Sequence, residues 1–192
     1  MRVNLSKAFV VDIEATCWQS KEEQGAQPNE IIEIGVAVFD FKADKVVDSA
    51  SIMVKPRFTK VSQFCADLTG WTQADVDRGF DIVDALNDFQ KEFKPTAEHL
   101  WFSCGDYDRN MLSTYSRKGI GQLYNIHTRA NPFEDMRHLN IKTLFALKHR
   151  LNKEVGMGGM LDMIGEKIEG RHHNGCDDAV NIAKIVRHVF KK

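Results

Sequence analysis

Asp12 and Glu14 are an acidic pair whose spacing suggests chemistry, because they interrupt the apolar run VVDIEA. Alternate side chains of a β-strand share a face, so both carboxylates should point away from the face that carries Val11 and Ile13. Neighbouring carboxylates repel each other unless a cation neutralises them, and a divalent metal would do so. Taken alone, such a pair is more often a strand end that meets water.

A second acidic pair lies in the segment FSCGDYDRNML, where helical spacing separates the two aspartates. Asp108 shares a helix face with Met111 and Leu112, and should therefore face the sheet. Asp106 falls on the solvated face and is more simply an N-cap or first-turn acid. An acid on an apolar face needs a partner, because burial of an unpaired charge is expensive. The pattern therefore favours Asp108 as the functional residue.

The segment HHNGCDDAV, which opens the last predicted helix, holds a third acidic pair. Asp178 lines up with Ile182 and Ile185 on the core-facing side, whereas Asp177 lies on the wet side. Both could merely complement the helix dipole, but this leaves the apolar position of Asp178 unexplained. Here too we expect the acid on the apolar face to be the functional one.

Three separated segments thus each place a carboxylate where the core should be apolar. Two-metal phosphoryl hydrolysis needs such a cluster, since two divalent ions activate water and hold the leaving oxygen. His173 precedes Asp178 by five positions, and an imidazole can accept the proton of the attacking water near neutral pH. A histidine in a loop is otherwise more often a plain surface residue.

The elements that must position these residues follow from hydrophobic periodicity. Strands are expected at 8–13, 31–41, 46–54 and 99–103, the first three as antiparallel neighbours. Helices are expected at 75–93, 106–117, 136–151, 160–168 and 177–190, with a looser stretch at 119–132. This order predicts a single α/β domain over residues 1–192, in which helices pack on a mixed sheet.

Composition is that of an ordinary globular chain, with 43% hydrophobic and 28% charged residues and a net charge of −1. This charge argues against a histone-like coat of nucleic acid, but a site filled with cations supplies its own positive charge. No signal peptide or membrane span is expected. The four cysteines, which form no CxxC pair, indicate reduced thiols and a cytoplasmic protein.

The sequence resembles the DEDDh 3′→5′ exonucleases, which have a ribonuclease-H-like fold. Their three motif blocks read here VVDIEATCW, FSCGDYDRNML and HHNGCDDAVNIAKIV. The likeness is greatest to the branch with the histone-mRNA 3′ exonuclease and the KapD-like proteins. The segments EIIEIGVAVF and FCADLTGWTQADVD also resemble that branch, so the likeness extends over roughly residues 5–190.

This resemblance implies a role for each motif residue. Two Mg²⁺ or Mn²⁺ ions would be held by Asp12, Glu14 and Asp178, with Asp12 bridging, and supported by Asp108. His173 would be the general base. Five further positions would line the substrate pocket, the first two through their backbone amides: Ala15, Thr16, Trp18, Leu68 and Tyr107. For Trp18, plain core packing is an equal alternative.

The expected function is a 3′→5′ exonuclease that releases nucleoside monophosphates from single-stranded nucleic acid with a free 3′ end, RNA in preference to DNA. One alternative is a DNA-proofreading exonuclease, which the absence of a polymerase-docking tail disfavours. An alternative from another class is a pseudo-nuclease that binds RNA without cutting it. The five filled chemical positions argue against that alternative. Contacts to the 2′-hydroxyl depend on local geometry, so sequence does not separate RNA from DNA.

The substrate strand is expected to follow a basic segment. Between Arg137 and Lys153 the chain has five basic residues and no acidic one, whereas the segment 75–92 is predominantly acidic. A polyanion should avoid the acidic helix and run along the basic segment toward the carboxylates. Lys148 and Arg150 are the expected phosphate contacts, and a solvated helix face that happens to be basic is the alternative.

Overall fold

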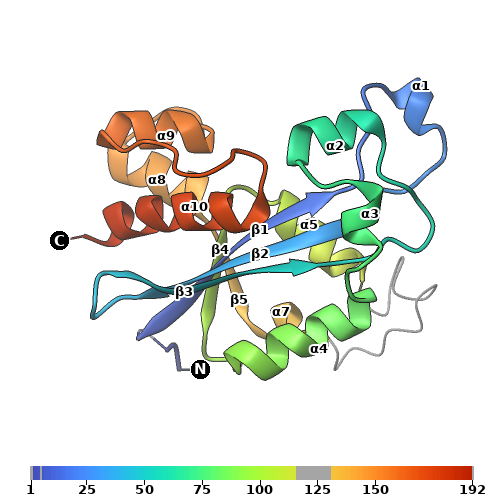
Figure 1. Ribbon diagram of the computed structural model, residues 1–192. Helices are drawn as coiled ribbons and strands as arrows, with labels where there is room; N and C mark the ends of the chain where they lie inside the picture. Colours follow the sequence, from blue (N-terminus) through green and yellow to red (C-terminus); the bar gives the residue numbers. More distant parts are fainter. Residues whose placement is uncertain (1, 5, 116–130, 192) are drawn as a thin grey trace.

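A computed structural model of the protein describes residues 2–4, 6–115 and 131–191 (Figure 1). Its described part contains one five-stranded sheet with the strand order β3-β2-β1-β4-β5. The strands are β1 (Lys7–Ala15), β2 (Ile31–Asp40), β3 (Lys45–Met53), β4 (Leu100–Ser103) and β5 (Arg137–Asn140). β1, β2 and β3 pair antiparallel, and β4 and β5 continue the sheet parallel to β1. The predicted ribonuclease-H-like mixed sheet with flanking helices is confirmed.

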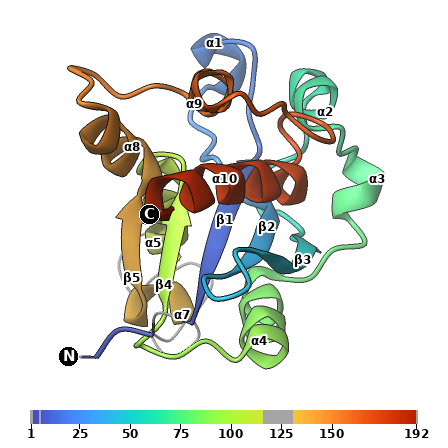
Figure 2. The ribbon, with the colours of Figure 1, turned by 90° about the vertical axis from the view of Figure 1, so that its left-hand side faces the viewer.

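The helices connect the strands and cover the sheet. They are α1 (Lys21–Gln24), α2 (Gln63–Thr69), α3 (Gln73–Val76), α4 (Ile82–Phe93), α5 (Tyr107–Thr114), α7 (Pro132–Asp135), α8 (Ile141–His149), α9 (Met157–Ile164) and α10 (Gly175–Phe190). Figures 1 and 2 show α8, α9 and α10 on one side of the sheet and α4 and α7 on the other.

Two cores, one on each face of the sheet, follow from the alternation of side chains along β1. Phe9, Val11 and Ile13 face α4, α5 and α7, where they pack with Leu86, Phe89 and Leu112, among others. Ala8 and Val10 face α8, α9 and α10. Both faces of β1 and β2 are therefore buried, which explains why these strands read as continuous apolar runs.

Two predicted helices differ from the structure. The helix predicted at 75–93 is two helices, α3 and α4, because the backbone between them pairs Phe80 with Val54 beside the sheet. The helix predicted at 136–151 begins instead with strand β5, and α8 follows it. The four residues of β5 extend the sheet through backbone pairing with β4, which a mostly polar sequence does not reveal.

Smaller differences concern the ends of elements. Helix α9 covers 157–164 rather than 160–168, and it ends at Gly165, whose φ of 73° favours glycine. Helix α2 was not predicted. The predicted end of the 106–117 helix and most of the stretch 119–132 lie outside the described residues, although α7 begins within that stretch, at Pro132. Among the described helices, none has both the length and the apolar character needed to cross a membrane.

Candidate active site

Asp12 and Glu14 lie on the face of the sheet that α10 covers. They alternate along β1 in step with Ala8 and Val10, which pack against α10. Val11 and Ile13 pack on the opposite face, as predicted. Across the antiparallel pair, Asp12 is opposite Gly35. The two carboxylates therefore point at the place where α10 begins.

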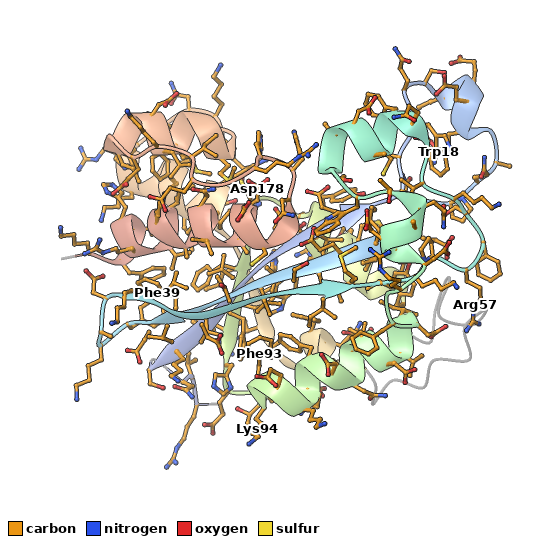
Figure 3. All side chains as sticks on the ribbon, viewed as in Figure 1. Trp18, Phe39, Arg57, Phe93, Lys94 and Asp178 are labelled. Atoms are coloured by element: carbon orange, nitrogen blue, oxygen red, sulfur yellow. The ribbon has the colours of Figure 1, made fainter. Side chains whose placement is uncertain are left out.

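Helix α10 approaches the sheet closely because two glycines meet. A Cβ atom at Gly35 of β2 would overlap the backbone of Gly175, the first residue of α10. The helix is capped by Asn174, whose side chain accepts from the amide of Asp177. This contact brings Asp178, in the first turn, over Asp12 and Glu14. Figure 3 shows Asp178 near the N-terminal end of α10.

Glu33 fixes the same helix end and was not singled out by the sequence. Its carboxylate is fully buried and accepts from the backbone amides of Gly175 and Cys176 at 2.9 and 3.3 Å. It also accepts from Trp71 Nε1 and Ser51 Oγ, both at 2.6 Å. An acid at a helix N-terminus complements the helix dipole. Glu33 is therefore a positioning residue that binds the helix start to the sheet.

Asp108 is buried in the first turn of α5, as predicted. Its Oδ1 accepts from the backbone amide of Ile13 at 3.0 Å, which ties α5 to the strand between Asp12 and Glu14. Asp106 is half exposed and lies 3.5 Å from Arg109. Asp106 occupies the N-cap position, but its side chain makes no capping hydrogen bond. The predicted difference in burial between Asp108 and Asp106 is confirmed.

Three of the carboxylates form a group that fits a metal ion. Asp12, Glu14 and Asp178 each offer an oxygen, and these atoms lie within 4.8 Å of one another. Burial raises the pKa of Glu14 to about 9, with further contributions from Glu33 and Asp178. Burial and the charge of Asp108 raise the pKa of Asp12. Burial likewise raises the pKa of Asp108 to about 6. This set of hard oxygen ligands suits Mg²⁺ or Mn²⁺.

Two histidines, His172 and His173, lie at the edge of this group. Their rings stack with centroids 4.0 Å apart. The Nδ1 atom of His172 lies 2.9 Å from Oδ2 of Asp178, and the backbone amide of His173 donates to the same oxygen at 2.9 Å. His173 has a φ of 65°, an uncommon backbone conformation for a residue with a side chain. Asp178 therefore holds the loop that presents both rings.

Asp177 also holds this loop, which corrects its predicted place on a purely solvated face. Its carboxylate accepts from the amide of Arg171 at 2.7 Å. Asn181, on the same helix face, is fully buried and bonds to the backbone of Glu169 in both directions. The loop that carries the histidines therefore packs on that face of α10, and the side chains of the face are only partly exposed to solvent.

The acids and histidines meet in a cavity of about 320 Å³. Its described lining is Asp12, Ile13, Glu14, Cys104, Tyr107, Asp108, Lys142, Met157, His172, His173 and Asp178. Asp12, Glu14, Asp108, Asp178, His173 and Tyr107 were expected from the sequence. Lys142 was noted there only as part of the basic segment. The four carboxylates and His173, which we call the five chemical residues, thus come together from three separate parts of the chain.

The other predicted pocket residues do not line this cavity. Thr16 is fully buried, and its amide donates to the carbonyl oxygen of Glu30 at 2.8 Å, so it is not free to bind a nucleotide. Ala15, Trp18 and Leu68 are also absent from the described lining. Leu68 belongs to α2, which borders the histidine loop, since Arg171 donates to the carbonyl oxygen of Asp67 at 2.9 Å.

The basic segment does not form one strand-binding face. The ammonium of Lys148 donates to the carbonyl oxygens of His188, Val189 and Lys191 at 2.7 to 3.1 Å, where it caps the end of α10. A cation is favourable at a helix C-terminus. These hydrogen bonds count against a contact between Lys148 and substrate phosphates, whereas Lys142 of the same segment lines the cavity.

We expect Gly35→Ala to destabilise the protein by roughly 1–3 kcal/mol, the usual cost of overpacking a close contact. The added methyl group must push α10 away from β2, because it would overlap backbone. Activity should fall with stability, since Asp178 moves with the helix. Gly158→Ala is the matched control, because its Cβ meets only Ile168 at an ordinary 3.8 Å. Urea denaturation of both variants checks this, and equal stability would contradict the close approach.

We expect Glu14→Gln to stabilise the metal-free protein at neutral pH by about 3 kcal/mol, because the fold keeps Glu14 protonated at a pH where the unfolded chain ionises it, and glutamine avoids this cost. Glu14 has a raised pKa, so its favourable contribution exists below pH 4.5 and is lost as the pH rises through about 9. The stability of the variant relative to wild type should therefore increase with rising pH. Addition of Mg²⁺ should stabilise only wild type. Thermal melts with EDTA or Mg²⁺ test this, with exposed Glu92→Gln as control. A variant that is less stable than wild type in EDTA would contradict the raised pKa of Glu14.

Comparison with known proteins agrees with this geometry. Mouse ERI1 exoribonuclease 2 is 27% identical over 190 residues, which cover 92% of this chain and 27% of that protein. The chain therefore spans only about a quarter of that relative's length. A crystallographic structure of the nuclease domain of 3′hExo, a DEDDh family member bound to rAMP, has a TM-score of 0.81 and 25% identity. That likeness covers 100% of this chain and 94% of the nuclease domain.

A second solved structure shows a 3′-exonuclease in specific recognition of the 3′ end of a histone mRNA stem-loop. It has a TM-score of 0.76 and 25% identity, over 97% of this chain and 82% of that one. These likenesses confirm the resemblance to the DEDDh branch with the histone-mRNA exonuclease. The exonuclease family RNase_T matches residues 9–186, which include all five chemical residues of the cavity. The chain belongs to the RNase_T exonuclease family.

Proposed function

We propose that this chain is a two-metal-ion 3′→5′ exonuclease that releases nucleoside monophosphates from single-stranded nucleic acid, with RNA preferred. The observation that carries the proposal is the group of Asp12, Glu14 and Asp178, which shares one cavity with Asp108 and His173. Burial and the neighbouring carboxylates raise the pKa values of Asp12 and Glu14, so the ionised group is costly without a cation. It is suited to binding divalent cations and a phosphate.

Each acid has a role in this proposal. Asp12, Glu14 and Asp178 would hold the Mg²⁺ or Mn²⁺ ions, and Asp108 would support them from α5. When bound, these ions activate water and stabilise the leaving oxygen. The amide of Ile13 holds Asp108, and Glu33 holds the helix that carries Asp178, so the acids are in place before substrate arrives.

His173 is the general base of the proposed reaction. Burial and the neighbouring charge of His172 lower the pKa of His173, so its imidazole is neutral and able to accept a proton at pH 7. Water adds to the phosphorus of the last phosphodiester as His173 takes its proton. The bond from that phosphorus to the 3′ oxygen breaks, and the 3′ oxygen takes up a proton from solvent. The products are a nucleoside 5′-monophosphate and a chain with a new 3′-hydroxyl. Tyr107 packs against the terminal nucleotide in this proposal, which its position at the cavity and its 53% exposure support.

The names of the relatives support RNA as the preferred substrate, since they describe an exoribonuclease, a histone mRNA complex and an rAMP complex. We also propose a cytoplasmic location, which the four free cysteines support, because cytosolic thiols stay reduced. Fractionation of cells by compartment tests that location, and recovery of the protein outside the cytoplasm would contradict it.

Digestion of matched RNA and DNA oligomers, each with a free or a blocked 3′ end, tests the proposed function. With Mg²⁺ we expect a ladder that shortens from the free 3′ end, faster for RNA than for DNA. No digestion is expected with EDTA or with a blocked 3′ end. Faster digestion of DNA would favour a proofreading-type exonuclease instead. Binding of RNA without hydrolysis in Mg²⁺ or Mn²⁺ would identify a pseudo-nuclease and overturn the proposal.

A further inference from the structure

Lys142 brings a cation to a cavity that is otherwise lined by acids and histidines. It is the second residue of α8, where the side chain of Asn140 accepts from its backbone amide at 2.9 Å. Among the described residues that line the cavity, Lys142 is the one lysine or arginine. Helix α8 follows β5 on the other side of β4 from the catalytic strand, so Lys142 enters from a different element than any of the acids.

The position of Lys142 is unfavourable for the helix itself. The N-terminus of a helix carries partial positive charge and disfavours a cation in the first turn. The first turn of α8 has no acidic residue to offset this repulsion. In the part of the chain that the structure describes, no carboxylate oxygen lies within 4.0 Å of the Lys142 ammonium, so the lysine forms no ion pair there. Lys148 of the same helix, in contrast, is fully occupied as a helix cap.

Gly105 leaves the space in which the Lys142 side chain lies. A Cβ atom at Gly105 would be 3.4 Å from Nζ of Lys142 and 3.7 Å from its Cε. The φ of Gly105 is 114°, which residues with a side chain rarely adopt. Gly105 lies three residues before Asp108, so the end of the lysine side chain is placed beside the start of α5.

The charges of the cavity leave a role for one further cation. Four carboxylates carry four negative charges when ionised, and two divalent ions would cancel them. A phosphodiester then adds one negative charge that the acids and ions leave unbalanced. An ammonium at the wall of the same cavity, with no ion-pair partner among the described residues, can donate to a phosphate oxygen in a charge-assisted hydrogen bond.

We propose that Lys142 is a substrate-binding residue that donates to a non-bridging oxygen of the phosphodiester before the 3′-terminal nucleoside. This inference rests on the proposed function, because it takes a nucleotide phosphate as the ligand of the cavity. It replaces the broader expectation of a basic strand path with one residue at the reacting group. A lysine that only filled space or kept the surface of α8 polar would not affect the binding of a ligand with a phosphate more than that of a ligand with a hydroxyl.

Binding of AMP and adenosine tests the inference without hydrolysis, since neither molecule has a phosphodiester. Dissociation constants are measured in Mg²⁺ for wild type, Lys142→Met and Lys142→Arg. The control is Lys153→Met, which removes an exposed cation of the same basic segment. Loss of a charge-assisted hydrogen bond should weaken AMP binding of Lys142→Met about 10- to 100-fold. Adenosine binding should be unchanged, Lys142→Arg should retain most AMP affinity, and Lys153→Met should match wild type.

Two results would overturn the inference. One is AMP affinity of Lys142→Met equal to that of wild type. The other is an equal loss for AMP and adenosine, which would indicate damage to the cavity and no phosphate contact. Wild-type protein that fails to bind millimolar AMP would also overturn it. Oligonucleotide digestion by wild type is measured separately, so a failure of the proposed function is distinguishable from a failure of the role of Lys142.

Discussion

Asp108→Asn and Asp178→Asn should each abolish hydrolysis, with a loss of at least roughly 10³-fold in kcat. Metal ions supply several kcal/mol of transition-state stabilisation, and each 1.4 kcal/mol is a factor of about ten. Both acids are buried at the cavity, and asparagine preserves their shape. In Asp108→Asn the amide oxygen of the new side chain can still accept from Ile13, so the fold should survive. Steady-state rates and thermal melts of the purified variants measure both effects.

The neighbouring aspartates are matched controls for these two substitutions. Asp106→Asn removes a half-exposed charge near Arg109 and should leave activity within a few-fold of wild type. Asp177→Asn should also stay largely active, because an asparagine oxygen can still accept from the amide of Arg171. An inactive Asp106→Asn beside an active Asp108→Asn would contradict the assignment of faces on α5. Similar modest losses for all four would indicate that the acids only cap helices.

His173→Ala should lower kcat about 10²–10⁴-fold, the usual contribution of general-base catalysis. In wild type, activity should rise with pH as the imidazole loses its proton. Because the pKa of His173 is lowered by burial, the midpoint of this rise should lie below pH 6.5. The variant should lose this acid limb. A pH–rate profile of kcat for wild type and His173→Ala makes the comparison.

His172 is the natural competitor for this role and provides the control. Its ring bonds to Asp178 in the structure, so His172→Ala should disturb the loop but leave the acid limb in place. Retention of Mg²⁺-induced stabilisation in His173→Ala would show that the metal ligands are intact. A larger defect in His172→Ala, together with loss of its acid limb, would reverse the choice between the two histidines.

The sequence predicted which four acids the fold brings into one cavity, because each acid broke a local rule. Asp108 and Asp178 sit on apolar helix faces, and such a break is visible without a structure. The strand β5 was missed because its residues Arg137–Asn140 are mostly polar. Pairing with β4 decides their conformation, and that partner lies far away in the sequence.

The supporting residues were less predictable than the acids they serve. Glu33 reads as one polar residue within an apolar strand, and its role depends on donors from Trp71, Ser51 and the start of α10. Lys142 and Lys148 look alike in the sequence, since both lie in one basic stretch. One lines the cavity and the other caps a helix, a difference that only the packing of α8 against α10 creates.

Hydrolysis of an RNA oligomer in water enriched in ¹⁸O tests the central claim most directly. The account predicts that water attacks the 3′-terminal phosphodiester, so mass spectrometry should find one ¹⁸O on the phosphate of the released nucleoside 5′-monophosphate. The remaining chain should end in an unlabelled 3′-hydroxyl, and EDTA should stop the reaction. Release of a 3′-phosphate or a cyclic phosphate, cleavage inside the chain, or labelled product in EDTA would contradict metal-dependent hydrolysis by this cluster of four carboxylates.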